Sequence, residues 1–274
     1  MKKHISLLLS LLLLFSLVFQ AGAATDINIP AQNSAHTANT PYNWYCKRTD
    51  DHTQPPLDSL FSFIEKDGLL TYHIDKKNSD PASGDKVIYL TFDAGYENGN
   101  VAKILDTLKA ENVTGAFFVL EHLVKNNTFL VKRMCDEGHL VCNHTATHPD
   151  MSKKATEEEF MQELWALEDV CEEYGIKLSD YYRPPEGRFS EDNLRIAAKN
   201  GYKTIFWSYA YADWDNNAQL TPSAAYEKVL SGTHNGEVIL LHPTSKTNAA
   251  ILGDLIREWK AQGYRFGTLD ELTK

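Results

Sequence analysis

The stretch KVIYLTFDAG, residues 86–95, sets the architecture expected for this chain. Residues 87–92 are β-branched, aromatic or aliphatic, which predicts a strand that ends at Asp93. Residues 116–120 form the next short apolar run, as is typical of a buried strand. A strand, a helix and another buried strand in succession favour a parallel sheet covered by helices. The helix between the two strands is predicted from apolar residues at helical spacing: Val101, Ile104, Leu105 and Leu108.

The same alternation continues toward the carboxyl terminus. Thr156 and Glu159 stand three residues apart at the start of one predicted helix, as in a capping box. Six or seven such units favour a closed or nearly closed α/β barrel over an open sheet. The further strands are predicted over residues 140–143, 181–182, 203–209 and 238–241, and a last short strand is predicted within residues 264–269. The further helices are predicted over residues 127–137, 156–170, 190–200, 222–230 and 249–262.

The amino terminus has the layout of a signal peptide. Lys2 and Lys3 give a positive start, residues 5–19 are almost entirely apolar, and residues 21–24 are small. We assign residues 1–24 as a signal peptide and expect an exported protein acting outside the cytoplasm. The alternative is an uncleaved membrane anchor, although the apolar run is somewhat short for a bilayer span.

Residues 25–85 form a polar, turn-rich segment ahead of the predicted barrel, which occupies residues 86–274. Aromatic residues such as Trp44 and Phe61 predict that this extension packs onto something larger. The extension is therefore expected to cover part of the barrel.

Composition narrows the classes of function. The formal net charge of −10 argues against a nucleic-acid-binding protein, which needs a basic face to displace counterions from phosphates. The four cysteines of an exported chain allow three pairings, and buried free thiols are an equally good interpretation. These are Cys46, Cys135, Cys142 and Cys171.

Five reactive side chains follow predicted strands or lie near their carboxyl ends. In β/α barrels this rim carries the chemistry, because the strands all point their carboxyl ends to the same side. A purely structural sequence has no reason to deliver reactive groups from five separate segments to one rim. The residues are Asp93, His144, Arg183, Asp213 and His242.

Taken singly, each of these residues has an ordinary structural interpretation. His144 and His148 are four residues apart and could bind one metal ion, but such a pair also arises by chance. Asp93 could be a metal ligand, a general base or a helix cap. Arg183 could hold a carboxylate ionised or form a loop salt bridge.

Asp213 and His242 also allow two interpretations. A carboxylate bonded to an imidazole fixes its tautomer and raises its pKa, as a general acid requires. The alternatives are a loop cap for Asp213 and a buried core histidine for His242.

The ordered set of motifs resembles the NodB-type polysaccharide deacetylases, carbohydrate esterase family four. The similarity extends from about residue 86 to residue 269. The longer strings resemble one branch of the family, the muramic-acid deacetylases that act in spore-cortex δ-lactam synthesis. The strings are TFDAGYENG (91–99), HTATHPDM (144–151), RPPEGRFS (183–190), DW (213–214) and LHPTS (241–245).

The resemblance implies a distorted (β/α)₇ barrel and a metal-dependent hydrolase that removes N-acetyl groups from peptidoglycan, with N-acetylmuramic acid as the expected target. It implies that Asp93 is the general base, oriented and ionised by Arg183, and that His242 is the general acid, tuned by Asp213. His144 and His148 would bind a divalent metal ion, for which zinc is expected. The partner would be a glycan strand, and the protein is expected to be a monomer.

The sequence departs from the common family pattern at Ala94, where most relatives carry an aspartate that is the third protein ligand to the metal. The departure leaves the identity of the metal open. Asp93 could move onto the metal, or water could take the position.

Three residues near the motifs are candidates for contact with the sugar. Tyr96 and Trp214 could stack on sugar rings, although core packing explains many such aromatic residues. Arg188 could pair with the lactyl or peptide carboxylate of a muramic acid, or it could be a solvated surface residue.

Two alternative functions remain at this stage. The first is the same chemistry on N-acetylglucosamine, in peptidoglycan or chitin. The second is a non-catalytic glycan-binding module, which the substitution at Ala94 suggests. The retained Asp93, Arg183, Asp213 and His242 argue against it, because binding alone needs no acid and base.

Overall fold

The computed structural model describes residues 39–49, 51–66, 68–79 and 85–274. The predicted signal peptide, residues 1–24, lies outside the described residues. Within these ranges, no helix combines the length and the apolar character needed to cross a membrane.

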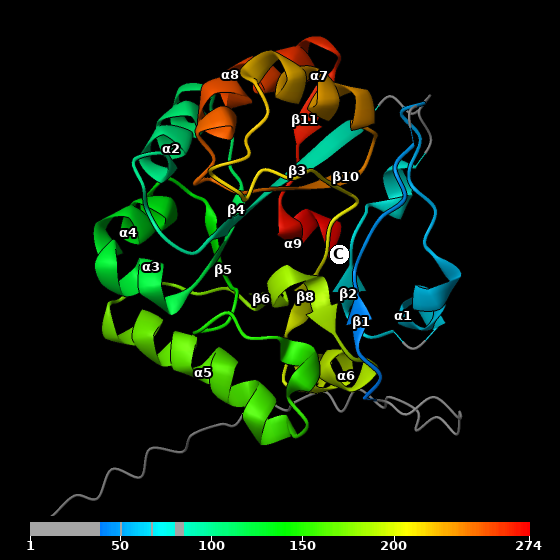
Figure 1. The fold of residues 1–274 in the computed structure, drawn as a ribbon, viewed down its shortest axis with the longest axis vertical. Coiled ribbons are helices and arrows are strands. Elements are labelled where there is room, and N and C mark those ends of the chain that lie inside the picture. Colours follow the sequence, from blue (N-terminus) through cyan, green and yellow to red (C-terminus); the bar gives the residue numbers. More distant parts are fainter. Residues whose placement is uncertain (1–38, 50, 67, 80–84) are drawn as a thin grey trace, which may run out of the picture.

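A parallel sheet forms the centre of the molecule, and it confirms the predicted α/β barrel class (Figure 1). The strand β3 (Lys86–Ala94) contains the stretch quoted above and pairs with three neighbours. The order across the sheet is β2 (Thr71–Tyr72), β8 (Lys203–Ile205), β6 (Tyr181–Tyr182), β5 (Leu140–Asn143), β4 (Ala116–Val119), β3, β10 (Glu237–Leu241) and β9 (Tyr209–Ala210), with β11 (Tyr264–Phe266) pairing on β3.

The sheet curls because β8 and β9 are consecutive in the chain yet lie near opposite ends of this order. The prediction of one strand over residues 203–209 was therefore wrong. The Arg183 side chain binds the carbonyl oxygens of Ile205 and Phe206, which removes them from strand pairing. Two residues later the Ser208 N–H pairs with the Val238 carbonyl, so the chain has changed partner from β2 to β10. This switch brings the two ends of the curled sheet together.

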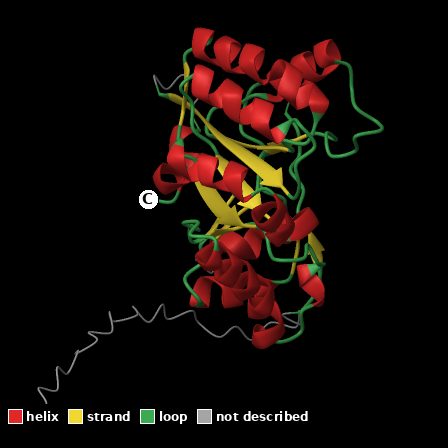
Figure 2. Cartoon of the chain, turned by 90° about the vertical axis from the view of Figure 1, so that its left-hand side faces the viewer, coloured by secondary structure: helices red, strands yellow, loops and turns green. Residues whose placement is uncertain are grey.

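Helices surround the strands, and Figure 2 shows the strands enclosed between helices on either side. The predicted capping box is confirmed at the start of α5, where Thr156 and Glu159 each bond the other's backbone N–H. The short helix α3 was not predicted. The α-helices of the barrel are α2 (Val101–Ala110), α3 (Glu121–Asn126), α4 (Thr128–Asp136), α5 (Glu157–Glu173), α6 (Glu191–Lys199), α7 (Pro222–Gly232), α8 (Lys246–Ala261) and α9 (Leu269–Leu272). Short 3₁₀ helices occur at Ser59–Phe61, Lys76–Asn78, Met151–Lys153 and Pro185–Gly187.

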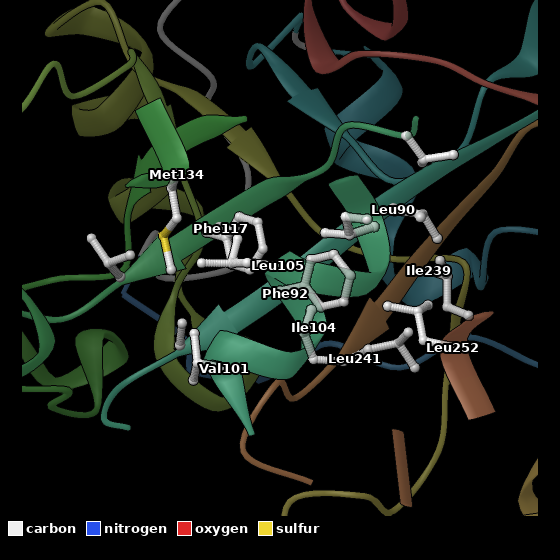
Figure 3. Packing of buried hydrophobic residues seen from close by; sticks show 14 of the residues in the cluster. Leu90, Phe92, Val101, Ile104, Leu105, Phe117, Met134, Ile239, Leu241 and Leu252 are labelled. Atoms are coloured by element: carbon white, nitrogen blue, oxygen red, sulfur yellow. The ribbon is translucent and has the colours of Figure 1, made fainter. Parts of the chain in front are cut away.

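Strand alternation divides the core into two layers. Leu90 and Phe92 face outward and pack among the side chains of α2, such as Ile104 and Leu105 (Figure 3). Val87 and Tyr89 belong instead to the cluster inside the barrel. Because side chains alternate along a strand, Asp93 points inward, on the same face as Val87 and Tyr89. The inner face of the barrel therefore carries the reactive residue.

The described part of the extension packs on the barrel. The strand β1 (Tyr42–Asn43) pairs antiparallel with β7 (Arg188–Phe189), and α1 (Ser62–Lys66) follows. Trp44 stacks on Phe206 with ring centroids 4.4 Å apart. The strand β2 even joins the main sheet, although it precedes residue 86. The extension is thus structurally continuous with the barrel.

Candidate active site

A cleft of about 740 Å³ opens at the carboxyl ends of the strands. All five predicted rim segments contribute to its lining, either through the predicted residue or through a residue near it in the chain. Its lining consists of Asp93, Gly95, Tyr96, Leu120, His144, His148, Glu186, Trp207, Ala210, Tyr211, Trp214, Leu240, His242 and Thr244.

Arg183 lies behind Asp93 and is fully buried. Its Nη1 donates to the Asp93 carboxylate at 2.7 Å, and its Nη2 donates to Thr91 Oγ1 at 2.9 Å. The guanidinium also lies over the ring of Phe118, 4.1 Å from the centroid. Each nitrogen of the guanidinium donates at least one hydrogen bond, and Arg183 holds Oδ1 of Asp93. The other oxygen, Oδ2, lies toward His144.

Burial and charge act in opposite directions on Asp93. Burial alone would raise the pKa of its carboxyl group, but the neighbouring Arg183 charge and hydrogen bond outweigh that effect and lower the pKa below its usual value. Asp93 is therefore an ionised carboxylate at neutral pH, in the protonation state that a general base needs.

His144 follows β5 and presents one ring nitrogen to Asp93. Its Nδ1 lies 2.9 Å from the Arg183 carbonyl, which can only accept, so the proton is on Nδ1. Nε2 is therefore free of hydrogen and lies 3.6 Å from Asp93 Oδ2. Burial lowers the pKa of His144 to about 4, which keeps the ring neutral. A neutral imidazole with a free Nε2 is ready to bind a metal ion.

The exposed ring of His148 lies next to His144, with centroids 5.1 Å apart. A strained bend of the backbone between the two histidines places the His148 ring beside that of His144, since Thr145 has φ 74° and His148 has φ 60°. Such angles cost about 1–3 kcal/mol each and need support from the surroundings. Asn143 Oδ1 accepts the Thr145 N–H, and Thr145 Oγ1 accepts the His148 N–H. These bonds hold the two imidazoles side by side.

Asp213 and His242 form the second pair of the site. His242 Nδ1 lies 2.7 Å from Asp213 Oδ1, and the His242 backbone N–H donates to Asp213 Oδ2 at 2.8 Å. Burial would lower the pKa of His242, but the hydrogen bond and charge of Asp213 outweigh it and raise the pKa above the ordinary value. His242 is thereby favoured in its charged form, in the state of a general acid.

The ligand set suits a divalent metal at His144 and His148, because two imidazoles beside a carboxylate are ligands that zinc prefers. Ala94 is fully buried at the end of β3, so it offers no third side chain. Within the described residues, no group of three histidine, cysteine or acidic side chains already has the spacing of a complete metal site. Asp93 is an acidic group beside this pair, because its Oδ2 lies 3.6 Å from His144 Nε2.

The predicted sugar-contacting residues divide into two groups. Tyr96 and Trp214 line the cleft and are 43% and 62% exposed, so their faces are available. Arg188 is not among the lining residues and pairs instead with Glu186 and Asp150. Its charge is thus already balanced by two carboxylates.

Two residues of the site, Thr91 and Glu186, were not predicted. Thr91 Oγ1 accepts from Arg183 and donates to the Ile239 carbonyl, which ties the guanidinium to the sheet. Glu186 lines the cleft, and its own backbone is left-handed, with φ 54°. Both residues stand inside the quoted motif strings. Because side chains alternate between the two faces of a strand, Thr91, two residues before Asp93, could have been predicted to lie on the same inner face. The four cysteines are free, and Cys142 lies inside the barrel.

A carboxylate held by arginine, a histidine pair and an acid–histidine pair lie around one cleft, and the comparisons show that the chain belongs to the polysaccharide deacetylase family. The family model for polysaccharide deacetylases matches residues 80–205. Deacetylases of this family are in general metal-dependent. The family predicted from the motifs is confirmed.

Particular relatives can also be named. The chain is 42% identical over 236 residues to the peptidoglycan-N-acetylmuramic acid deacetylase PdaA of Bacillus subtilis, covering 85% of this chain and 86% of that protein. A solved structure of PdaA, described as a family 4 carbohydrate esterase, matches with a TM-score of 0.78 over 85% of this chain and 97% of that one. The peptidoglycan-N-acetylglucosamine deacetylase PgdA of Listeria monocytogenes is 38% identical over 70% of this chain and 40% of its own length.

Proposed function

We propose that this enzyme removes the N-acetyl group from N-acetylmuramic acid in exported peptidoglycan strands, as a step toward muramic δ-lactam in spore cortex. The observation that carries the chemistry is one cleft lined by both Asp93, held ionised by Arg183, and His242, held charged by Asp213. The choice of muramic acid is supported by the similarity to PdaA over most of both chains.

Asp93 and His242 perform different proton transfers in the proposed reaction. Asp93 accepts a proton from the water that attacks the acetyl carbonyl, and Arg183 keeps that carboxylate ionised beforehand. His242 gives a proton to the departing nitrogen, since an amine is a poor leaving group unless it is protonated. The products are acetate and a free amino sugar.

His144 and His148 would hold a divalent metal ion, with Asp93 as a further ligand or neighbour. When bound, the metal supplies Lewis acidity toward the acetyl group and toward water. The neutral state of His144 and its unprotonated Nε2 support this role. Zinc is the metal proposed, because imidazole nitrogen suits it.

The glycan would lie across the cleft against Tyr96 and Trp214. Their exposed aromatic faces on the cleft wall support stacking on sugar rings. We assign no carboxylate-binding role to Arg188, because Glu186 and Asp150 already engage it.

The same site could act on N-acetylglucosamine, and the similarity to PgdA favours this second candidate. The deciding experiment is incubation of the purified protein with peptidoglycan, with and without added zinc, followed by mass analysis of the muropeptides. Loss of acetyl from muramic acid supports the proposal, and loss from glucosamine supports the alternative. Loss from neither sugar, with zinc present, would contradict both and favour a glycan-binding module.

A further inference from the structure

The carboxylate of Asp213 receives more hydrogen bonds than the general acid alone provides. Asp213 is 1% exposed, and His242 uses its Nδ1 and its backbone N–H on the two carboxylate oxygens. A third donor reaches it from another element: Asn248 Nδ2 lies 2.6 Å from Asp213 Oδ2. Asn248 is itself 1% exposed and stands in the first turn of α8.

The orientation of the Asn248 amide follows from its neighbours. The Asp213 carboxylate and the His242 carbonyl oxygen, 3.1 Å away, can only accept hydrogen bonds. The amide nitrogen must therefore face both of them. The amide oxygen then faces the hydroxyl of Tyr211, which donates to it. All the hydrogen-bonding groups of the Asn248 side chain are satisfied in this one orientation.

The backbone of Asn248 is fixed as well. Its N–H donates to Ser245 Oγ, the cap of α8, and the Ser245 N–H donates to the His242 carbonyl. The start of α8 thus holds both ends of the Asp213–His242 pair. Tyr211 lines the cleft, so the network runs from the cleft wall through Asn248 to the carboxylate.

We infer that Asn248 is a positioning residue for the general acid and that Tyr211 orients its amide. The inference rests on the proposed function, since it assigns His242 the protonation of the leaving nitrogen. Without the amide, Asp213 keeps its negative charge but loses one of the two hydrogen bonds to Oδ2, and with it the restraint that comes from outside the Asp213–His242 pair. The bond from His242 Nδ1 to Asp213 is then held less firmly in line. The step affected is the cleavage of the C–N bond, in which the nitrogen takes its proton from His242.

The test compares two leaving groups in the zinc-loaded full chain. An N-acetyl sugar needs a proton on nitrogen as the C–N bond breaks, whereas the phenolate of 4-nitrophenyl acetate departs with its electron pair and needs none. We expect Asn248→Leu to lower kcat for the amide about 100-fold, with KM little changed and ester hydrolysis lowered less than about tenfold. Tyr211→Phe keeps the ring of the cleft wall and should show a smaller loss, again confined to the amide.

Thr247→Val is the matched control. Thr247 stands one residue earlier in the same buried turn, and its hydroxyl donates to the Leu220 carbonyl, away from Asp213. We expect both activities of this variant to stay within about twofold of wild type. Equal losses on amide and ester in Asn248→Leu, or no loss on either, would overturn the inference. If that variant does not unfold cooperatively, Tyr211→Phe decides in the same way.

A second measurement separates this inference from the proposed substrate. The Nδ1 proton of His242, bonded to a carboxylate, should give a proton resonance far downfield of the backbone amides, assigned by its loss in His242→Gln. We expect Asn248→Leu to shift it upfield or broaden it and Thr247→Val to leave it in place. An unchanged resonance in Asn248→Leu would contradict the inference. If the wild type deacetylates neither sugar but the resonance changes in Asn248→Leu and not in Thr247→Val, only the proposed function is contradicted.

Discussion

At Asp93, a buried carboxylate is kept charged by one buried arginine, and this balance decides whether the site has a base. Asp93→Asn removes the base but keeps an oxygen that can accept from Arg183 Nη1. We expect kcat for deacetylation to fall by about 10²–10⁴, with the far-ultraviolet circular dichroism spectrum unchanged. Asp106→Asn, at a largely exposed position on α2, is the control and should retain full activity. A normal rate in Asp93→Asn would refute the assignment of the base.

The two shifted pKa values predict a broad pH plateau for kcat. His242 must be protonated, so activity is lost as pH rises through its pKa, which lies above the ordinary 6.5. Asp93 must be ionised, so activity is lost as pH falls through its pKa, which lies below the ordinary 3.8. In Asp213→Asn the charge that raises the pKa of His242 is gone, so the alkaline limb should move to lower pH. A pH titration of kcat checks this, and an alkaline limb that does not move would contradict it.

Metal removal tests the histidine pair. Dialysis against a chelator should abolish deacetylation, and added zinc should restore it, because the protein groups alone lack a Lewis acid. His148→Gln should weaken zinc binding at least tenfold by calorimetry, because it removes one of two imidazole ligands. His122, on α3 and outside the cleft lining, provides the matched control His122→Gln. Activity that survives complete metal removal would be incompatible with the proposed site.

The helix α5 has a capping box that the sequence predicts and supports the histidine loop in a way that the sequence does not predict. Its capping box is predicted from spacing alone and is present in the structure. The same helix also supports the histidine loop, since the Glu163 side chain accepts from the backbone N–H and hydroxyl of Thr147. Helix stability and site geometry are therefore linked through α5.

Thr156→Ala removes the side-chain cap of α5. We expect it to lower the free energy of unfolding by about 1 kcal/mol, measured by urea denaturation. Glu158 lies in the same first turn, is exposed and takes no part in the capping box. Glu158→Gln should therefore change stability by less than about 0.5 kcal/mol. Equal effects in the two variants would argue against the box.

The switch between β8 and β9 could not be predicted from sequence. Residues 203–209 read as one apolar strand, and nothing local marks a break. The break follows from Arg183, twenty or more residues earlier in the chain, whose side chain binds two carbonyls of the segment. Strongly apolar strands such as β3 and β10 were predicted to within about two residues, because their pattern is set by burial on both faces.

For the molecule as a whole, the extension and the barrel share one aromatic cluster. Trp44 is 5% exposed, stacks on Phe206 and donates from Nε1 to the Trp207 carbonyl at 3.0 Å. Trp207 in turn lines the cleft. The extension therefore supports the wall of the active site from outside the barrel.

Trp44→Ala should lower the free energy of unfolding by about 3–5 kcal/mol, because it leaves a cavity among buried rings. Leu60, 51% exposed in the same extension, is the control, and Leu60→Ala should cost less than about 1 kcal/mol. Chemical denaturation monitored by fluorescence and circular dichroism provides the measurement. A loss near that of the control would mean that the extension contributes little to stability.

The sequence by itself determined the class of fold, the family and the rim positions of Asp93, His144, Arg183, Asp213 and His242. These follow from local patterns, because burial sets the period of strands and helices and because each reactive residue stands at the end of a strand. Only the tertiary structure decided which groups touch: that Arg183 engages Asp93, that Arg188 pairs with Asp150, and that Asn248 reaches Asp213. Such contacts join residues 35 or more positions apart, and hydrogen bonds between distant side chains leave no periodic signal in the chain.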